Sequence, residues 1–119
     1  MKKRNEPKIV NNFLEKFVDN LDNLDVMRRS KAKTHKEKRK DPMDVCIRNG
    51  FGDYEKVIEE TIRSLTYSDY QYTQDDNQYH AGDLFIFYKE IKGVTLLVKI
   101  QLNKFTGNSY VKSFHELRD

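Results

Sequence analysis

The sequence predicts a single α+β domain, in which N-terminal helices pack on a small antiparallel sheet of three to four strands. Two amphipathic helical patterns lie in the first 65 of its 119 residues, and three strand-like segments follow one another near the C-terminus. The short connections between these segments are typical of antiparallel hairpins. A chain of this length can form one compact core but not two, so we expect one domain over residues 1–119.

The first expected element is a helix over residues 8–21, because its apolar residues recur at spacings of three and four. A short helical turn over residues 43–47 should end near Gly50, which readily takes left-handed backbone angles. A second clear helix should begin after Asp53, a favourable N-cap, and continue to Leu65 with the same period.

Strands are expected from the apolar, β-branched and aromatic residues of three segments: 83–90, 93–102 and 109–116. Before them, residues 66–82 are polar and rich in tyrosine, and we expect a long ordered loop there. On the middle strand, Lys99 and Gln101 share the face opposite the one expected to pack on the helices. We therefore expect a binding site on this second face.

The net charge of +3 hides a strong asymmetry along the chain. Residues 1–40 hold 13 Lys/Arg against 6 Asp/Glu, whereas residues 41–119 hold 9 against 13. Most of the excess lies in residues 28–40, which we expect to form a basic arm or loop, while residues 1–7 should be a flexible N-terminus. Such a density of positive charge suits a polyanion or an acidic protein partner.

Other features argue against several classes of protein. Cys46 is the only cysteine, and no apolar run is long enough for a signal peptide or a membrane span, so we expect a cytoplasmic protein without membrane association. The spacing of His35, His80 and Cys46 does not suit metal ligands, and no glycine-rich phosphate loop occurs. The sequence predicts no metal, no cofactor and no particular oligomeric state.

The strands carry groups suited to RNA cleavage. RNA can be cut by its own 2′-hydroxyl when a base, an acid and cations surround the phosphate. We expect His115 to act as acid or base, since an imidazole changes charge near neutral pH, and Lys99 and Lys89 to stabilise negative charge. Each residue also has a simpler interpretation. His115 would be an exposed histidine at a strand end, Lys99 would reach solvent from an open face, and Lys89 would pair with Glu90.

Further residues are expected to hold the substrate. The basic arm would bind phosphates without reading sequence, and tyrosines of the polar loop would stack on unpaired bases, although tyrosines also pack in small cores. The expected RNA-binding residues are Arg28, Arg29, Lys31, Lys33, Tyr70, Tyr72 and Gln101.

Four short motifs stand in order along the chain: Leu65-Thr-x-x-Asp-Tyr70, Phe85-Ile86-Phe87 with a following Lys-Glu pair, Leu97-Val98-Lys99-Ile100 and Ser113-Phe114-His115. With the preceding helix and basic segment, this order resembles the MqsR-like toxins of bacterial toxin–antitoxin systems, relatives of the RelE group. The resemblance implies a compact RelE-like fold and a metal-independent endoribonuclease, an mRNA interferase. Its partners would be messenger RNA, free or on the ribosome, and a cognate antitoxin.

The sequence departs from the family's pattern at two positions, which leaves alternatives open. Leu97 replaces a strand tyrosine, and Tyr72 stands where a loop lysine is common. Either Tyr72, Tyr88 or Lys89 compensates, or catalysis is weak. A non-enzymatic module that binds nucleic acid or the ribosome through residues 28–40, or a protein-directed inhibitor using the same arm, is the alternative function.

Overall fold

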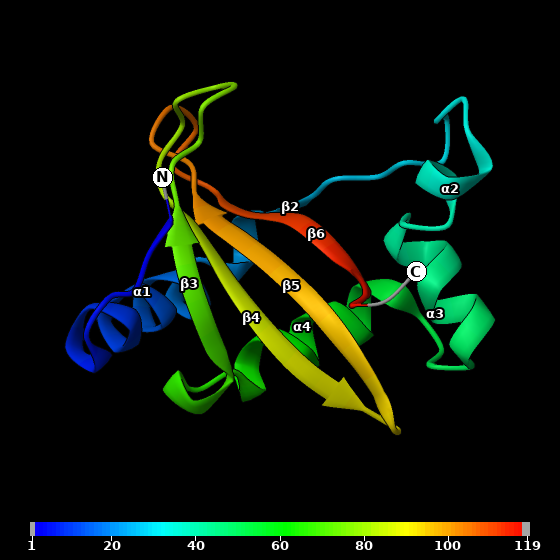
Figure 1. The fold of residues 1–119 in the computed structure, drawn as a ribbon, viewed down its shortest axis with the longest axis horizontal. Coiled ribbons are helices and arrows are strands. Elements are labelled where there is room, and N and C mark those ends of the chain that lie inside the picture. Colours follow the sequence, from blue (N-terminus) through cyan, green and yellow to red (C-terminus); the bar gives the residue numbers. More distant parts are fainter. Residues whose placement is uncertain (1, 118–119) are drawn as a thin grey trace.

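A twisted six-stranded sheet with the order β1-β3-β4-β5-β6-β2 organises the protein (Figure 1). The computed structural model describes residues 2–117. Its elements are β1 (Lys2–Lys3), α1 (Pro7–Asp19), η1 (Leu21–Asn23), β2 (Leu24–Val26), α2 (His35–Lys38), α3 (Pro42–Asn49), α4 (Tyr54–Ser64), η2 (Tyr67–Asp69), β3 (Tyr70–Gln74), β4 (Leu84–Ile91), β5 (Val94–Leu102) and β6 (Ser109–Glu116).

The predicted α+β class is confirmed, but the predicted antiparallel sheet of three to four strands was wrong, because the sheet in residues 2–117 is mixed and has six strands. The four strands β3 to β6 form an antiparallel meander, β1 adds antiparallel to β3, and β2 adds parallel to β6. The extra strands β1 and β2 have only two and three residues, too few for a periodic pattern to reveal them.

Local sequence explains where the helices begin and end. Pro7 opens α1, where a missing amide hydrogen costs nothing. Gly50 ends α3 with φ +67°, a backbone angle that side chains disfavour. The Asp53 carboxylate accepts a hydrogen bond from the Glu55 amide at 3.1 Å and so caps α4.

The polar loop expected over residues 66–82 is shorter than predicted. Its first half forms η2 and β3, and β3 pairs with β4 through Tyr72 opposite Ile86 and Thr73 opposite Phe85. The N-terminus, expected to be flexible, contributes β1, and Arg4 donates to the Gln71 carbonyl at 2.7 Å. Because the side chains of β3 are largely polar, the sequence pattern does not indicate a strand there, and pairing with β4 stabilises it.

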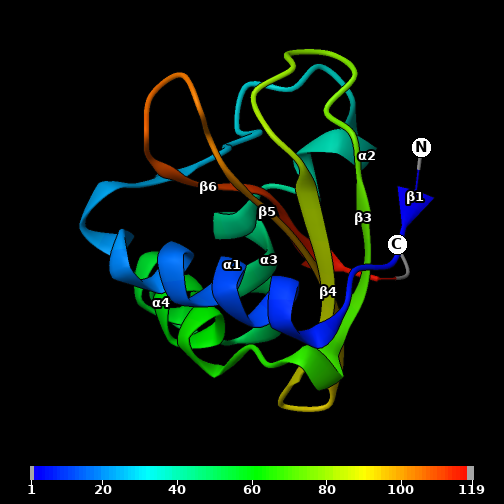
Figure 2. The same cartoon turned by 90° about the vertical axis from the view of Figure 1, so that its left-hand side faces the viewer.

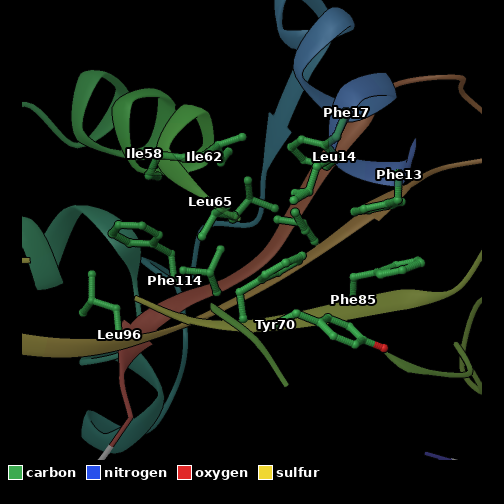
Figure 3. Close-up of a cluster of buried hydrophobic side chains, with 14 of the residues drawn as sticks. Phe13, Leu14, Phe17, Ile58, Ile62, Leu65, Tyr70, Phe85, Leu96 and Phe114 are labelled. Atoms are coloured by element: carbon green, nitrogen blue, oxygen red, sulfur yellow. The ribbon is translucent and has the colours of Figure 1, made fainter. Parts of the chain in front are cut away.

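The hydrophobic core lies between one face of the sheet and the helices α1 and α4 (Figures 2 and 3). Phe13 of α1 stacks on Phe85 of β4 with 3.8 Å between ring centroids. Ile58 and Ile62 of α4 and Phe114 of β6 are almost completely buried in the same cluster. We call this side of the sheet the helix face.

Among the described residues, no helix covers the other side of the sheet over β3, β4 and β5 (Figure 1), and we call this side the open face. Figure 2 shows α1 and α4 together on the helix face. On the open face Ile86, Gln101 and Ser113 are nevertheless buried, so a ligand can contact only its partly exposed side chains, which include Lys99 and Tyr72.

Candidate functional site

A row of four side chains crosses the open face. Tyr72 of β3 lies opposite Ile86 of β4, Ile86 opposite Lys99 of β5, and Lys99 opposite Ser113 of β6. Residues directly opposite each other in a sheet point to the same side. The row therefore places the partly exposed Tyr72 ring and Lys99 ammonium on one side of the sheet, where Ile86 and Ser113 are buried.

A β-bulge in β6 adds a second ammonium group to this row. Lys99 pairs with Ser113, whereas the next residue, Ile100, pairs with Val111, so Lys112 is an extra residue on its strand. The Lys112 ammonium lies 5.1 Å from the centre of the Tyr79 ring, and Lys112 lines an open-face cavity together with Tyr110. Lys99 and Lys112 therefore share the open face.

Lys99 lies within a group of cations that we call the cation cluster: Lys2, Arg29, Lys40, Lys99 and Lys112. Burial lowers the pKa of Lys99 below its ordinary value, and the positive charges of the other four members lower it further. Glu37 offsets part of this charge, because it pairs with Arg29 at 2.7 Å and with Lys40 at 3.8 Å. The cluster creates a local excess of positive potential beside the central strand.

His115 stands next to the cation cluster on the open face. It lies opposite Leu97, one step diagonally from Lys99, a position for which backbone separations of roughly 7–8 Å are usual. The Nδ1 atom lies 2.9 Å from the Glu116 carbonyl oxygen. Because a carbonyl can only accept, Nδ1 donates its proton, and Nε2 carries the lone pair in the neutral ring.

The strand end that carries His115 is fixed by α3. Arg48 donates to the Glu116 carboxylate at 2.6 and 2.8 Å, and the Asn49 amide donates to it at 2.9 Å. Arg48 also forms a short ion pair with Asp44. The hydrogen bonds from Arg48 and Asn49 lower the pKa of Glu116 despite its burial, and they hold β6 in place beside the cation cluster.

The structure does not bring Lys89 to this site. Lys89 pairs with Leu96, a core residue, so its side chain emerges on the helix face. There its ammonium contacts the Asp69 carboxylate and the Ser64 carbonyl, each at 3.3 Å. The prediction that Lys89 and Lys99 act on one phosphate is therefore corrected: they lie on opposite faces of the sheet.

Two further predicted RNA-binding residues are buried in structural roles. Tyr70 is 2% exposed, and its hydroxyl bonds to Thr73 within the core edge. Gln101 lies on the open face but is 1% exposed, and its amide donates to Asp76 at 3.0 Å and to the Gly82 carbonyl at 2.8 Å. Tyr72, in contrast, is partly exposed and lies beneath the Lys2 ammonium at 4.5 Å.

The basic arm is less free than its sequence indicates. Arg28 forms two hydrogen bonds to the buried Asp41 carboxylate, at 2.8 and 3.1 Å, and lies over the Tyr54 ring. Its positive charge is therefore already paired within the protein. Arg29 belongs to the cation cluster. Lys31 and Lys33 are exposed, as the arm prediction requires.

Several residues of the open face could not be found from sequence periodicity. Strict alternation groups Lys112 with the core residue Phe114, and only the bulge separates them. Lys2 reaches the site through the two-residue strand β1. Lys40 lay within the predicted arm, but nothing in its spacing indicated proximity to Lys99.

Other chemistries receive no support from the described residues. Within residues 2–117, no three His, Cys, Asp or Glu side chains are grouped so that they could hold a metal ion. Burial raises the pKa of the Cys46 thiol to about 11, so its thiolate form is disfavoured. No helix in this part of the chain has the length and apolar character needed to cross a membrane.

Comparisons with known proteins leave the family open. No family model matches the sequence, and neither a characterised protein nor a solved structure matches the chain.

Proposed function

We propose that this protein is an endoribonuclease that binds single-stranded RNA on the open face and cleaves it through the RNA's own 2′-hydroxyl. In this proposal, His115 transfers a proton, Lys99 and Lys112 stabilise the phosphate, and Tyr72 and the other cations position the chain. The resemblance to MqsR-like toxins makes messenger RNA the expected substrate and a cognate antitoxin the expected partner, with both encounters in the cytoplasm.

The observation that carries the proposal is the cation cluster around Lys99. Like charges on a partly buried surface repel each other and are poorly solvated, so the unliganded protein is destabilised by this arrangement. A phosphodiester supplies the missing negative charge and accepts hydrogen bonds from both ammonium groups. Within residues 2–117, no carboxylate forms a salt bridge with Lys99. Binding of a polyanion would therefore reduce the repulsion among these cations.

The proposed reaction follows from the positions of the imidazole and the two lysines. A base removes the proton of the 2′-hydroxyl, and the resulting oxygen attacks the phosphorus atom. The bond from phosphorus to the 5′-oxygen breaks, and an acid protonates that oxygen. His115 can serve in either step through Nε2, while Lys99 and Lys112 stabilise the additional negative charge on the phosphate oxygens. The products carry a 2′,3′-cyclic phosphate and a 5′-hydroxyl.

The test is cleavage of a single-stranded RNA by the purified protein and by His115→Ala. The wild type should generate 2′,3′-cyclic phosphate ends, and the variant should lose at least about 100-fold in rate, as expected for a proton-transfer group. Lys89→Gln is the matched control, because it removes a cation from the opposite face of the same sheet. Equal rates for wild type and His115→Ala would exclude His115 from the reaction.

The same observation also supports a second function, in which the open face binds RNA without cleaving it. The cation cluster does not include His115, so binding and chemistry are separable. RNA binding by the wild type without any cyclic phosphate product would favour this binding module. In that case, induced expression of wild type and His115→Ala should affect cell growth equally.

A further inference from the structure

An aromatic cavity adjoins the cation cluster at one end of the open face. It has a volume of about 410 Å³ and is lined on its floor by Gln101, Tyr110 and Lys112. Its rim carries Tyr79 and Phe105, which are 59% and 70% exposed. Each of these exposed rings has a lysine ammonium near it, since Lys112 lies 5.1 Å from the Tyr79 centroid and Lys104 lies 5.5 Å from the Phe105 centroid.

The two loops that carry these rings are fixed before any ligand binds. The buried Asp76 carboxylate accepts the Tyr79 amide at 3.0 Å, the Ala81 amide at 3.2 Å and the Gln101 side chain at 3.0 Å. The Lys104 amide donates to the Ala81 carbonyl at 2.9 Å and joins the two loops directly. Both loops lie together at the upper end of the sheet in Figure 1.

The loop that carries Phe105 is also internally ordered. The Asn103 side chain accepts the Phe105 amide at 2.9 Å and the Thr106 amide at 3.1 Å, and the Gly107 amide closes onto the Asn103 carbonyl at 2.8 Å. Gly82, at the base of the other loop, allows close packing, since a Cβ there would lie 2.8 Å from the Leu102 carbonyl oxygen. The rings are thus presented by a rigid support, which lowers the entropy cost of binding.

Lys112 connects this cavity to the phosphate-binding part of the open face. Its ammonium lies over the Tyr79 ring, and its charge acts on both Lys99 and Asp76. Gln101, on the floor of the cavity, follows Lys99 by two residues on β5, a distance of about 7 Å along a strand. A single nucleotide can bridge that distance.

We infer that Tyr79 and Phe105 form a stacking subsite for one unpaired base of a single-stranded RNA whose neighbouring phosphate lies on Lys99 and Lys112. This inference rests on the proposed binding of RNA to the open face and specifies where its bases go. Aromatic side chains beside a positively charged groove are the usual arrangement for holding unpaired bases, because every base offers a π-face. The cationic surroundings favour a base attached to a phosphate over an uncharged apolar ligand.

The test compares two 2′-O-methyl RNA pentamers, which cannot be cleaved because the nucleophilic hydroxyl is blocked. One carries all five bases and the other is abasic throughout, so that both present the same backbone charge. The wild type should bind the base-bearing pentamer at least about tenfold more tightly than the abasic one. Tyr79→Ala/Phe105→Ala should reduce this ratio severalfold while leaving affinity for the abasic pentamer unchanged.

Conservative variants separate stacking from folding. Tyr79→Phe and Phe105→Tyr keep the rings and should keep the preference for bases. The chain has seven tyrosines and no tryptophan, so stacking can also be followed as quenching of tyrosine fluorescence. The wild type should be quenched by the base-bearing pentamer, and Tyr79→Phe should lose part of that signal at unchanged affinity.

The outcomes distinguish this inference from the proposed function. Equal binding of the two pentamers, or a preference that survives in the double alanine variant, overturns the stacking subsite and leaves the phosphate site standing. Binding of neither pentamer overturns both. A base preference that depends on the two rings, in a protein that does not cleave unmodified RNA, upholds the subsite and overturns the nuclease.

Discussion

Lys99 and Lys112 face the same side of the sheet because β6 carries one extra residue at the point where its pairing passes from Lys99 to Ile100. In a strand without this bulge, Lys112 would share the face of Phe114, two residues further on, and point into the helix face. Two ammonium groups side by side lower the stability of the folded state unless a ligand neutralises them.

Lys99→Met should stabilise the protein and weaken its binding to RNA. The substitution keeps the length of the side chain while it removes a partly buried charge whose pKa is lowered by burial and by neighbouring cations. We expect the free energy of unfolding at pH 7 to rise by up to about 1 kcal/mol, measured in urea. RNA affinity, measured by fluorescence anisotropy, should fall at least about fivefold.

The size of the stability gain in Lys99→Met depends on pH. A lysine with a lowered folded-state pKa destabilises the protein while it is charged, and this cost disappears as the pH rises through its folded and then its unfolded pKa. The advantage of Lys99→Met should therefore shrink at alkaline pH. Lys89→Met is the matched control and should not gain stability, because Lys89 pairs with Asp69 on the helix face. A destabilised Lys99→Met protein would contradict the prediction.

The salt dependence of RNA binding should report the number of cations that contact phosphates. For single strands, the slope of log K against log salt is about −0.7 per neutralised phosphate. Lys112→Gln should therefore make the slope less negative by about 0.7, whereas Lys56→Gln, an exposed position on α4, should leave it unchanged. An unchanged slope in Lys112→Gln would remove Lys112 from the phosphate contacts.

The elements with strong periodicity were predictable from sequence. The helix expected over residues 8–21 is α1, and the three expected strands correspond to β4, β5 and β6 within one residue at each end. Apolar spacing determines which face of each element is buried, and that information is local. The α+β class followed from the order of these elements.

The arrangement of the site was less predictable, because it depends on pairing between distant residues. Lys99 and His115 were expected on one surface, and the register places both on the open face. The prediction for Lys89 was wrong because side chains two residues apart on a strand share a face. Phe85 and Phe87 of the same strand are buried against the helices, so Lys89 also lies on the helix face. Lys112 was missed because a bulge leaves no local signal in the sequence.

The basic arm should contain two functionally different kinds of residue. Arg28→Ala should lower the free energy of unfolding by about 2–3 kcal/mol, because it leaves the buried Asp41 carboxylate without its guanidinium partner. The double variant Lys31→Ala/Lys33→Ala should leave stability within about 0.5 kcal/mol, since both side chains are exposed, but weaken RNA binding. Urea unfolding and anisotropy measure the two effects. Equal behaviour of Arg28→Ala and the double variant in both assays would contradict this division.

Asp76 should make the protein sensitive to acid. Hydrogen bonds from Tyr79, Gln101 and Ala81 outweigh the effect of burial and lower the pKa of Asp76 from 3.8 to about 2. A carboxylate with a lowered folded-state pKa contributes stability above its unfolded pKa, and this contribution is lost as the pH falls toward the folded value. The shift corresponds to about 2 kcal/mol, present at pH 5 and lost progressively between about pH 4 and pH 2.

Asp76→Asn isolates this contribution, because the other carboxylates are unchanged. The amide group of Asn would turn a donor toward the amides that Asp76 now accepts, so the variant should lose at least about 2 kcal/mol at pH 5. The difference from wild type in urea unfolding should shrink as the pH falls to 2. Asp83→Asn, at an exposed pair with Lys3, should show almost no difference at any pH. If the free energies of unfolding of wild type and Asp76→Asn changed in parallel between pH 2 and 5, the charged form of the Asp76 carboxylate would not be what holds the Tyr79 loop.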